Sequence, residues 1–415
     1  MTLNNRQKKF IAIISAVAVV LLALTIAVST VMYSMKEYMD QFLGSGKMHT
    51  VSSSGLDGKY IDFENTSAAE SKAAAQEVTQ ETAEEGIVLL KNKDNALPLS
   101  KETKITILGY YSWHNNMAGG EDPATTDGAV SLAKGVENMF KTNTMVAELY
   151  SQNRAEFSAD EVATKLDAAK STFAEYDTAI ITFKRNSGEG NDQVTDSGAA
   201  EYNRTGLSLN NAELALVDYA CKNFNKVIIV INAANGIYTD PYSKKTYDFS
   251  KIVGAYWAGC CGSQGGTAFA KILSGEVNPS GHTPDTYARY LRNDPTYVNF
   301  GNFEYSNGAQ LNSYATSTFF VEYEEDIYIG YRYHETAAAE AAKGNYAGYD
   351  YDKEVVYPFG YGLSYTTFKY EYEGAPTYND KTETYTFKVK VTNTGSKDGK
   401  GVAQIYVNVP YEKGQ

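Results

Sequence analysis

Between Lys104 and Leu273 the sequence alternates short, β-branched apolar runs with stretches that favour helix, and this alternation constrains the fold more than any other feature. The predicted strands are 104–108, 178–183, 226–232 and 252–257, and the predicted helices are 161–176, 211–224 and 265–273. Strands that alternate with helices form a mostly parallel sheet covered by helices on both faces. We therefore predict an α/β fold.

The flanks of this region set the predicted domain boundaries. A stretch rich in Ala, Glu and Gln predicts a helix from Ser67 to Glu85, with Ser67 or Thr66 as its N-cap. After Leu363 apolar and polar residues alternate at period two, which predicts antiparallel strands at 365–372, 382–393 and 401–409. We expect an α/β domain at 67–354, followed at 355–415 by a linker and an incomplete antiparallel β-sandwich.

The N-terminal region predicts a membrane segment. Phe10 to Tyr33 is a run of 24 residues without charge, long enough to cross a bilayer as a helix. The cations before it, Arg6, Lys8 and Lys9, favour a cytoplasmic N-terminus. The length of the run favours an uncleaved signal anchor over residues 1–35, and a cleaved signal peptide is the alternative. In both cases the polar stalk at 36–66 and the bulk of the chain lie outside the cytoplasm, held in the first case by a single pass through the cell membrane.

Charge and composition exclude some functions. The 415 residues carry a formal net charge of −13, which disfavours nucleic acid as a partner. The cysteines Cys221, Cys260 and Cys261 are odd in number, and two of them are adjacent, so they do not form a disulfide framework. The histidines His49, His114, His282 and His334 lack the spacing of metal ligands. We predict neither a metal nor a cofactor.

The segment Arg185–Asp192 carries the main candidate site. It places Glu189 between two glycines, directly after the strand predicted at 178–183. In open α/β sheets, ligands bind at the carboxyl ends of the strands, where a carboxylate can transfer a proton. Arg185, Ser187 and Asp192 either support Glu189 or satisfy the backbone of the loop. The alternative for Glu189 itself is a solvated loop acid.

Five segments, in this order along the chain, resemble glycoside hydrolase family 3, the family of many β-glucosidases. They are Glu85–Asn92 with Leu97–Leu99, Arg185–Asp192, Val277–Gly281 with Pro284 and Thr286, Tyr323–Tyr333, and Pro358–Thr366. The resemblance covers about residues 67 to 415. It implies the family's C-terminal-type α/β sandwich domain and the start of a fibronectin type III-like domain.

The resemblance also implies a mechanism. Retaining glycosidases use two carboxyl groups about 5 to 5.5 Å apart. Glu189 matches the family's acid/base glutamate, while the family's nucleophile is an aspartate on a (β/α)₈ barrel that this sequence does not contain. We expect that barrel from a continuation of the chain, and an oligosaccharide or β-glucoside as the substrate. Gln193 stands where the family usually has arginine, which puts the ion pairing of the loop in doubt.

Two functions of different class remain open. In the first, the chain is the exported part of a β-glucosidase-like enzyme and is inactive without the barrel. In the second, it is a catalytically silent glycan-binding or scaffold protein of the cell surface. We expect the glycine-rich segment Gly262–Gly266 to form a strand-to-helix turn rather than a phosphate site. We expect turn-forming roles for Asn232, Asn235 and Asp240 rather than contacts with sugar hydroxyls.

Overall fold

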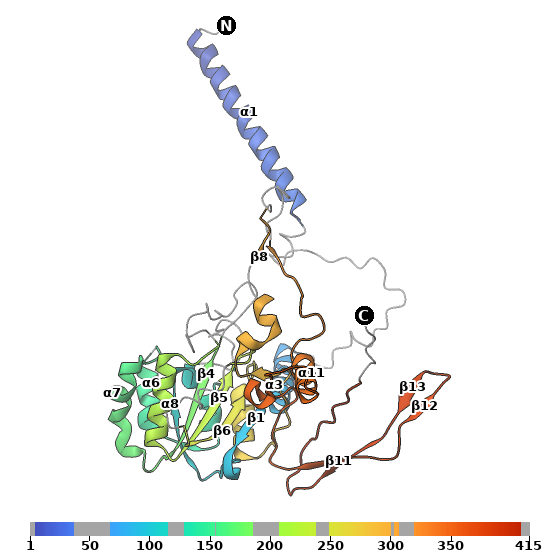
Figure 1. Cartoon of the computed structure of the whole chain (residues 1–415). Coiled ribbons are helices and arrows are strands. Elements are labelled where there is room, and N and C mark those ends of the chain that lie inside the picture. The colour runs from blue at the N-terminus through green and yellow to red at the C-terminus, as the bar shows by residue number, and fades with distance from the viewer. Residues whose placement is uncertain are drawn as a thin grey trace. The chain divides into compact units, whose positions relative to one another are not determined.

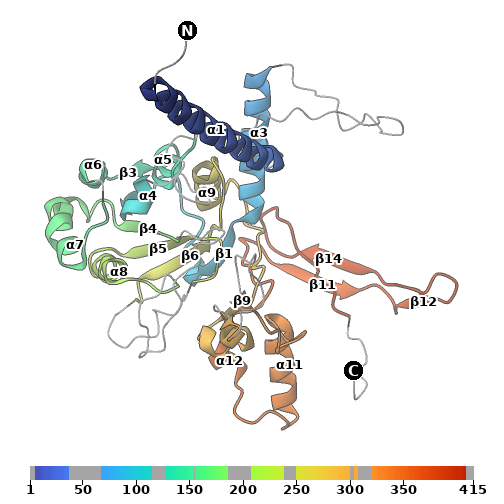
Figure 2. The same ribbon diagram turned by 90° about the horizontal axis from the view of Figure 1, so that it is seen from above.

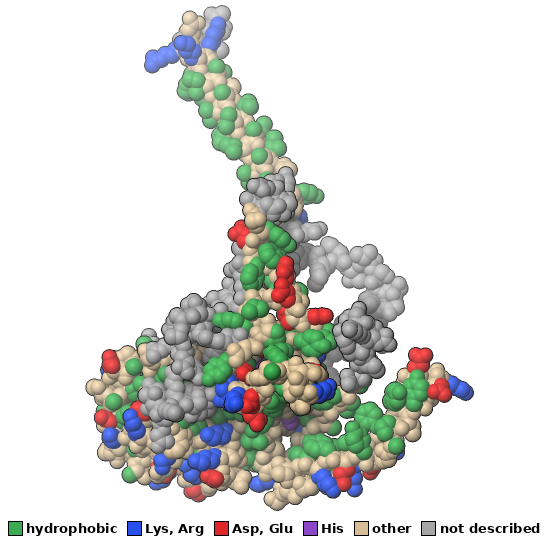
Figure 3. All heavy atoms as spheres, viewed as in Figure 1, with side chains coloured by type: hydrophobic (Ala, Val, Ile, Leu, Met, Phe, Trp, Pro, Cys, Tyr) green, Lys and Arg blue, Asp and Glu red, His purple; other side chains and the backbone are tan. Residues whose placement is uncertain are grey.

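The computed structural model describes residues 5–36, 67–114, 128–153, 155–185, 207–237, 249–299, 303–306 and 319–407. The chain divides into two compact units, Met1–Thr66 and Ser67–Gln415. In the first unit, the helix α1 (Asn5–Ser34) exposes all of its side chains. Hydrophobic side chains run along it, with Lys and Arg side chains at its N-terminal end (Figure 3). The helix α1 is long and apolar enough to cross a membrane. A signal sequence shares these two properties, so the anchor and the signal peptide both stay open as interpretations.

The second unit is built on one six-stranded sheet with the strand order β1-β6-β5-β4-β2-β3 (Figure 1). The strands are β1 (Val88–Asn92), β2 (Lys104–Leu108), β3 (Lys141–Thr142), β4 (Thr178–Lys184), β5 (Lys226–Asn232) and β6 (Ile252–Trp257). β1 pairs antiparallel with β6 at one edge, and all the other pairs are parallel. The predicted α/β class is confirmed, and the four predicted strands agree with β2, β4, β5 and β6 to within one residue.

Helices cover both faces of the sheet because successive strand residues point to opposite sides. The helices are α3 (Ala68–Gly86), α4 (Tyr110–His114), α5 (Leu132–Glu137), α6 (Thr144–Gln152), α7 (Ala159–Leu166), α8 (Asn211–Asn223) and α9 (Gly265–Ser274). Ile181 and Phe183 of β4 enter a core cluster with α6, α7 and α8, and Ile180 enters a second cluster with α3, α5 and α9. Figure 2 shows α8 and α9 on opposite sides of β5.

Several elements differ from the sequence analysis, among them one helix and one strand of this unit. The helix predicted at 161–176 is divided into α7 and the 3₁₀ helix η3 (Asp167–Thr172). In η3 the hydroxyl of Thr172 donates to the carbonyl of Ala169 at 2.6 Å, a local bond that competes with regular helix. The strand β1 was not predicted, because a short apolar run next to a helical pattern does not distinguish a strand from a buried helix end.

Small elements follow the sheet. They are β7 (Tyr287–Ala288), η5 (Leu291–Asn293), η6 (Pro295–Asn299), β8 (Phe303–Glu304), β9 (Phe319–Phe320), α11 (Tyr331–Ala342), α12 (Tyr351–Glu354) and β10 (Val355–Tyr357). The backbone passes close to the end of α3 here: a Cβ on Gly281 would lie 2.6 Å from the carbonyl oxygen of Ile87. Only glycine fits at this crossing without a shift of the backbone.

The C-terminal region contains β11 (Phe368–Tyr372), β12 (Thr377–Asn379), β13 (Thr384–Thr386) and β14 (Val389–Asn393). β11 pairs antiparallel with β14, and β12 with β13, and this antiparallel pairing agrees with the prediction. The single strand expected at 382–393 is divided into β13 and β14, and β12 was not predicted. The strand expected at 401–409 was wrong over its described part, because residues 401–407 form no strand. Residues 401–407 pair with none of the strands that the structure describes, so they lack the ladder hydrogen bonds of a sheet. The domain boundary at 354/355 stays a prediction.

Candidate active site at the carboxyl ends of the strands

The order of the strands places a switch point at the carboxyl ends of β2 and β4. From β2 the chain continues outward to β3 and then returns to β4 on the other side of β2. Such a reversal of strand order marks where open α/β sheets bind their ligands. Gly109 follows β2 here and Arg185 follows β4, so both border this position. Gly109 adopts a φ of +89°, a left-handed conformation that favours glycine and turns the chain into α4.

Arg185 lies at this edge in a largely buried ion pair. Its Nη1 donates to Oε1 of Glu213 and its Nη2 donates to Oε2, each at 2.7 Å. Nη2 also donates to the carbonyl of Ser208 at 2.8 Å. The exposed fractions of the two side chains are 10% for Arg185 and 1% for Glu213. Two parallel charge-assisted bonds give this pair a fixed geometry.

Glu213 also belongs to a capping box at the start of α8. Its Oε2 accepts from the backbone N–H of Asn210 at 2.8 Å, and its own N–H donates to Oδ1 of Asn210 at 2.9 Å. These two bonds satisfy donors that the first turn of a helix leaves free. A carboxylate in the first turn is also favoured by the helix dipole. The sequence indicates the cap but not the pairing with Arg185, 28 residues away.

Two further titratable side chains lie near this pair. Burial raises the pKa of Glu156, and the Glu213 carboxylate raises it further, while a hydrogen bond from Asn210 and the charge of Arg185 oppose the rise. Burial also raises the pKa of the Tyr111 hydroxyl, with Glu156 adding to the effect. The sequence analysis missed both residues. Glu156 precedes α7 in a loop, where nothing in its spacing indicates burial.

Some of the other predicted site residues lie outside the described part of the chain, and the rest bind loop backbone. Glu189, Ser187 and Asp192 lie outside the described residues, as do Gln193 and Asp240. Nδ2 of Asn232 donates to the carbonyl of Gly259 at 2.6 Å, and Nδ2 of Asn235 donates to that of Gly236 at 2.9 Å. Both contacts hold loop backbone, which fits the turn-forming interpretation.

The glycines at 262–266 serve a tight helix crossing. A Cβ on Gly266 would lie 2.1 Å from the carbonyl oxygen of Ser131, and one on Gly135 would lie 1.9 Å from the carbonyl oxygen of Gly266. The backbones of α5 and α9 therefore touch, and glycine is the residue that permits this. The described residues contain no group of three His, Cys, Asp or Glu side chains that could hold a metal ion. Cys221 and Cys261 are buried free thiols, and Cys260 is exposed.

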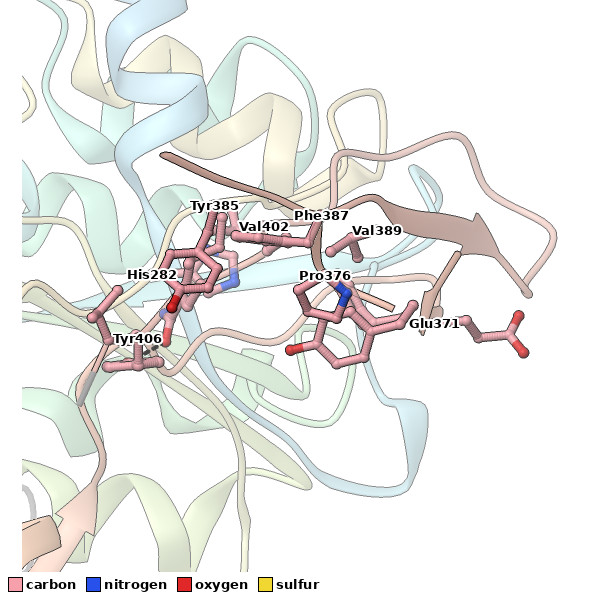
Figure 4. A pocket seen from close by; sticks show the side chains of 15 residues that line it. His282, Glu371, Pro376, Tyr385, Phe387, Val389, Val402 and Tyr406 are labelled. Atoms are coloured by element: carbon pink, nitrogen blue, oxygen red, sulfur yellow. Dashed lines mark hydrogen bonds between the residues drawn. The ribbon is translucent and has the colours of Figure 1, made fainter. Parts of the chain in front are cut away.

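A separate groove lies in the C-terminal region (Figure 4). Its volume is about 1060 Å³, and residues of β11, the segment 385–389 and the segment 402–407 line it together with His282. Five of its fifteen lining residues are tyrosine or phenylalanine: Tyr370, Tyr372, Tyr385, Phe387 and Tyr406. It contains none of the predicted site residues.

Comparison with known proteins places this geometry in a family. Residues 87–331 match the Glycosyl hydrolase family 3 C-terminal domain. The chain is 32% identical over 376 residues to Beta-glucosidase A of Butyrivibrio fibrisolvens, covering 81% of this chain and 42% of the relative. It is 30% identical over 355 residues to a beta-glucosidase of Ruminococcus albus, covering 80% of this chain and 32% of the relative.

Comparison with solved structures also finds beta-glucosidases. The structure is similar to that of beta-glucosidase 3B from Thermotoga neapolitana in complex with α-D-glucose, with a TM-score of 0.58 and 25% identity over 81% of this chain and 44% of that one. It is also similar to a beta-glucosidase from Paenibacillus barengoltzii, with a TM-score of 0.60 and 26% identity over 77% of this chain and 33% of that one. The chain thus spans less than half the length of these relatives. The chain belongs to glycoside hydrolase family 3 and contains its C-terminal α/β domain.

Proposed function

We propose that this chain supplies the acid/base carboxyl group of a retaining, β-glucosidase-like hydrolase, and that Glu189 carries this group. The observation that carries the proposal is the match of residues 87–331 to the family domain, with Arg185 fixed at the carboxyl edge of the sheet immediately before the Glu189 segment. The nucleophile is expected on a (β/α)₈ barrel from a continuation of the chain. The substrate class is a β-glucoside or oligosaccharide.

The proposed roles follow from the chemistry of a double displacement. The barrel carboxylate attacks the anomeric carbon while Glu189 protonates the leaving oxygen, and the ionised Glu189 then removes a proton from the attacking water. A carboxyl group that performs both steps needs a pKa raised towards neutrality, which burial beneath the substrate and a neighbouring carboxylate provide. The apolar helix α1 is proposed as the anchor that holds the exported domain to the cell membrane.

The test uses a restored enzyme, defined as this chain together with a family 3 barrel. The barrel is either encoded after the codon for Gln415 or supplied as a separate polypeptide. We expect no measurable hydrolysis of aryl β-glucosides by the 415-residue chain alone, because it offers one of the two carboxyl groups, and measurable hydrolysis by the restored enzyme. Activity of the chain alone, or inactivity of the restored enzyme, would contradict the proposal.

A second candidate function is a glycan-binding surface protein without catalysis. The aromatic groove favours it, because ligand pockets combine aromatic walls with a few polar groups. Calorimetric titration of cello- and xylo-oligosaccharides separates the two functions. Binding that is lost in Tyr385→Ala and kept in Glu189→Gln supports the groove, whereas binding that needs the barrel supports the enzyme.

A further inference from the structure

Arg185 joins the two ends of one chain segment. It is the last described residue before residues 186–206, and Leu207 and Ser208 are the first described residues after them. Its guanidinium group binds the Ser208 carbonyl and, with two bonds, the carboxylate of Glu213. Its own backbone N–H donates to the carbonyl of Asn232 on the neighbouring strand at 3.2 Å. A single side chain therefore ties the end of β4 to the start of α8.

Glu213 is the other half of this link. It is almost fully buried, and its carboxylate accepts hydrogen bonds from both Arg185 and the backbone of Asn210. Glu213 stands in the first turn of α8, and Arg185 directly follows the last residue of the central strand β4. A side chain on a regular element keeps its geometry better than one on a loop, so Glu213 gives Arg185 a well-placed partner. A lysine in place of Arg185 would keep the charge but lose the two-bond geometry.

We propose that Glu213 is a positioning residue of the enzyme: acting through Arg185, it fixes where the segment that carries Glu189 leaves and re-enters the domain. This inference rests on the proposed function of Glu189. A misplacement of about 1 Å in a catalytic group can slow a reaction about 100-fold. The ion pair is thus assigned a role in catalysis without contact to the substrate.

The variants are chosen to change the link and little else. Glu213→Gln keeps the volume of the side chain and an oxygen for the Asn210 N–H, but removes the charge that Arg185 meets. Arg185→Lys keeps a cation and removes the second bond. The matched control is Glu84→Gln, which breaks another ion pair of 2.7 Å, to Lys271 on α9.

The decisive readout is the value of kcat/KM of the restored enzyme for two substrates. An unactivated disaccharide needs a proton on its leaving oxygen, and a glucoside with an acidic phenol does not. We expect Glu213→Gln and Arg185→Lys to lower kcat/KM about 100-fold for the disaccharide and far less for the aryl glucoside. Glu84→Gln should change neither value. An equal loss for both substrates, or no loss, would show that the link has only a structural role.

A second measurement separates this inference from the proposed function. Hydrogen exchange on the 415-residue chain in detergent reports the link without any activity. Peptides covering 186–210 should exchange faster in Glu213→Gln than in the wild type. In Glu84→Gln their exchange rate should equal that of the wild type. If the wild-type restored enzyme is inactive, the proposed function fails, and the positioning role fails with it. If exchange in 186–210 is unchanged in both link variants, the link itself is refuted. Arg185→Lys provides the same readout should Glu213→Gln not fold.

Discussion

Single residues at the carboxyl edge show how one carboxylate serves two structural purposes. Glu213 is only 1% exposed, and its carboxylate accepts hydrogen bonds from both Arg185 and the Asn210 N–H. Breaking a buried pair by removing one partner typically costs about 3–5 kcal/mol, since it leaves a charge without compensation. The same residue caps α8, so the start of this helix and the end of β4 share one set of bonds.

A first prediction at this scale concerns Glu189 in the restored enzyme. General acid catalysis typically contributes about 10²- to 10⁴-fold, most when the leaving group is poor. Glu189→Gln should therefore slow hydrolysis of an unactivated disaccharide by about that factor and slow release of an acidic phenol far less. Added azide should restore part of the turnover, because an anion attacks the glycosyl-enzyme without a general base. Equal slowing of both substrates with no effect of azide would make Glu189 a structural loop acid.

A second prediction concerns Glu156 and pH. Burial raises the pKa of Glu156 in the folded chain above its ordinary value. The folded state then binds more protons than the unfolded state between the two pKa values, so this residue lowers stability as pH rises through that window. Glu156→Gln, which keeps the hydrogen bond with Asn210, should raise the Tm at neutral pH, and the gain should vanish in acid below the ordinary carboxyl pKa. Melting curves from pH 4 to pH 7 test this; a gain that does not depend on pH would contradict the assigned cause.

At the scale of elements, the sequence predicted what periodicity encodes. The strands β2, β4, β5 and β6 are short, β-branched and bounded by polar residues, and each was predicted to within one residue. The strand β1 was missed because an edge pairing is decided by tertiary contacts. The 3₁₀ helix η3 was missed because a local side-chain hydrogen bond to the backbone competes there with regular helix. The same holds for the site: the loop after β4 was predicted from the strand, while the pair Arg185–Glu213 depends on how α8 packs.

The crossing of α5 and α9 gives a prediction at this scale. A Cβ on Gly266 would lie 2.1 Å from the carbonyl oxygen of Ser131, and backbone on both sides leaves no room for a shift. Overpacking of this kind costs about 1–3 kcal/mol or more. Gly266→Ala should therefore lower the free energy of unfolding measured in urea by at least that amount.

The matched control is Gly86→Ala at the end of α3, where a Cβ would meet nothing within 4 Å. Alanine is a better helix former than glycine by about 1 kcal/mol, so this variant should be as stable as the wild type or slightly more. Equal stability of both variants would show that the two helices can separate at low cost.

At the scale of the whole molecule, one long apolar helix, with cations only in its first turns, precedes an acidic domain that belongs to a family of glycoside hydrolases. A domain whose proposed substrates are β-glucosides or oligosaccharides has its use where such glycans occur, and export through α1 would bring it there. If α1 inserts into the membrane, the cations in its first turns would set the direction of insertion, since positive charge is retained on the cytoplasmic side.

The last prediction is the topology itself. Arg6, Lys8 and Lys9 precede the uncharged span, so residues 36–415 should lie outside the cytoplasm. Protease added to intact cells should digest the large domain while a cytoplasmic marker stays intact, and alkaline carbonate should leave the undigested chain in the membrane pellet. Release of a shortened chain by carbonate would mean that α1 is a cleaved signal peptide. If the large domain resists protease until the cells are opened, it lies in the cytoplasm and the predicted orientation is wrong. The helix α1 would then no longer support the proposal of an exported hydrolase.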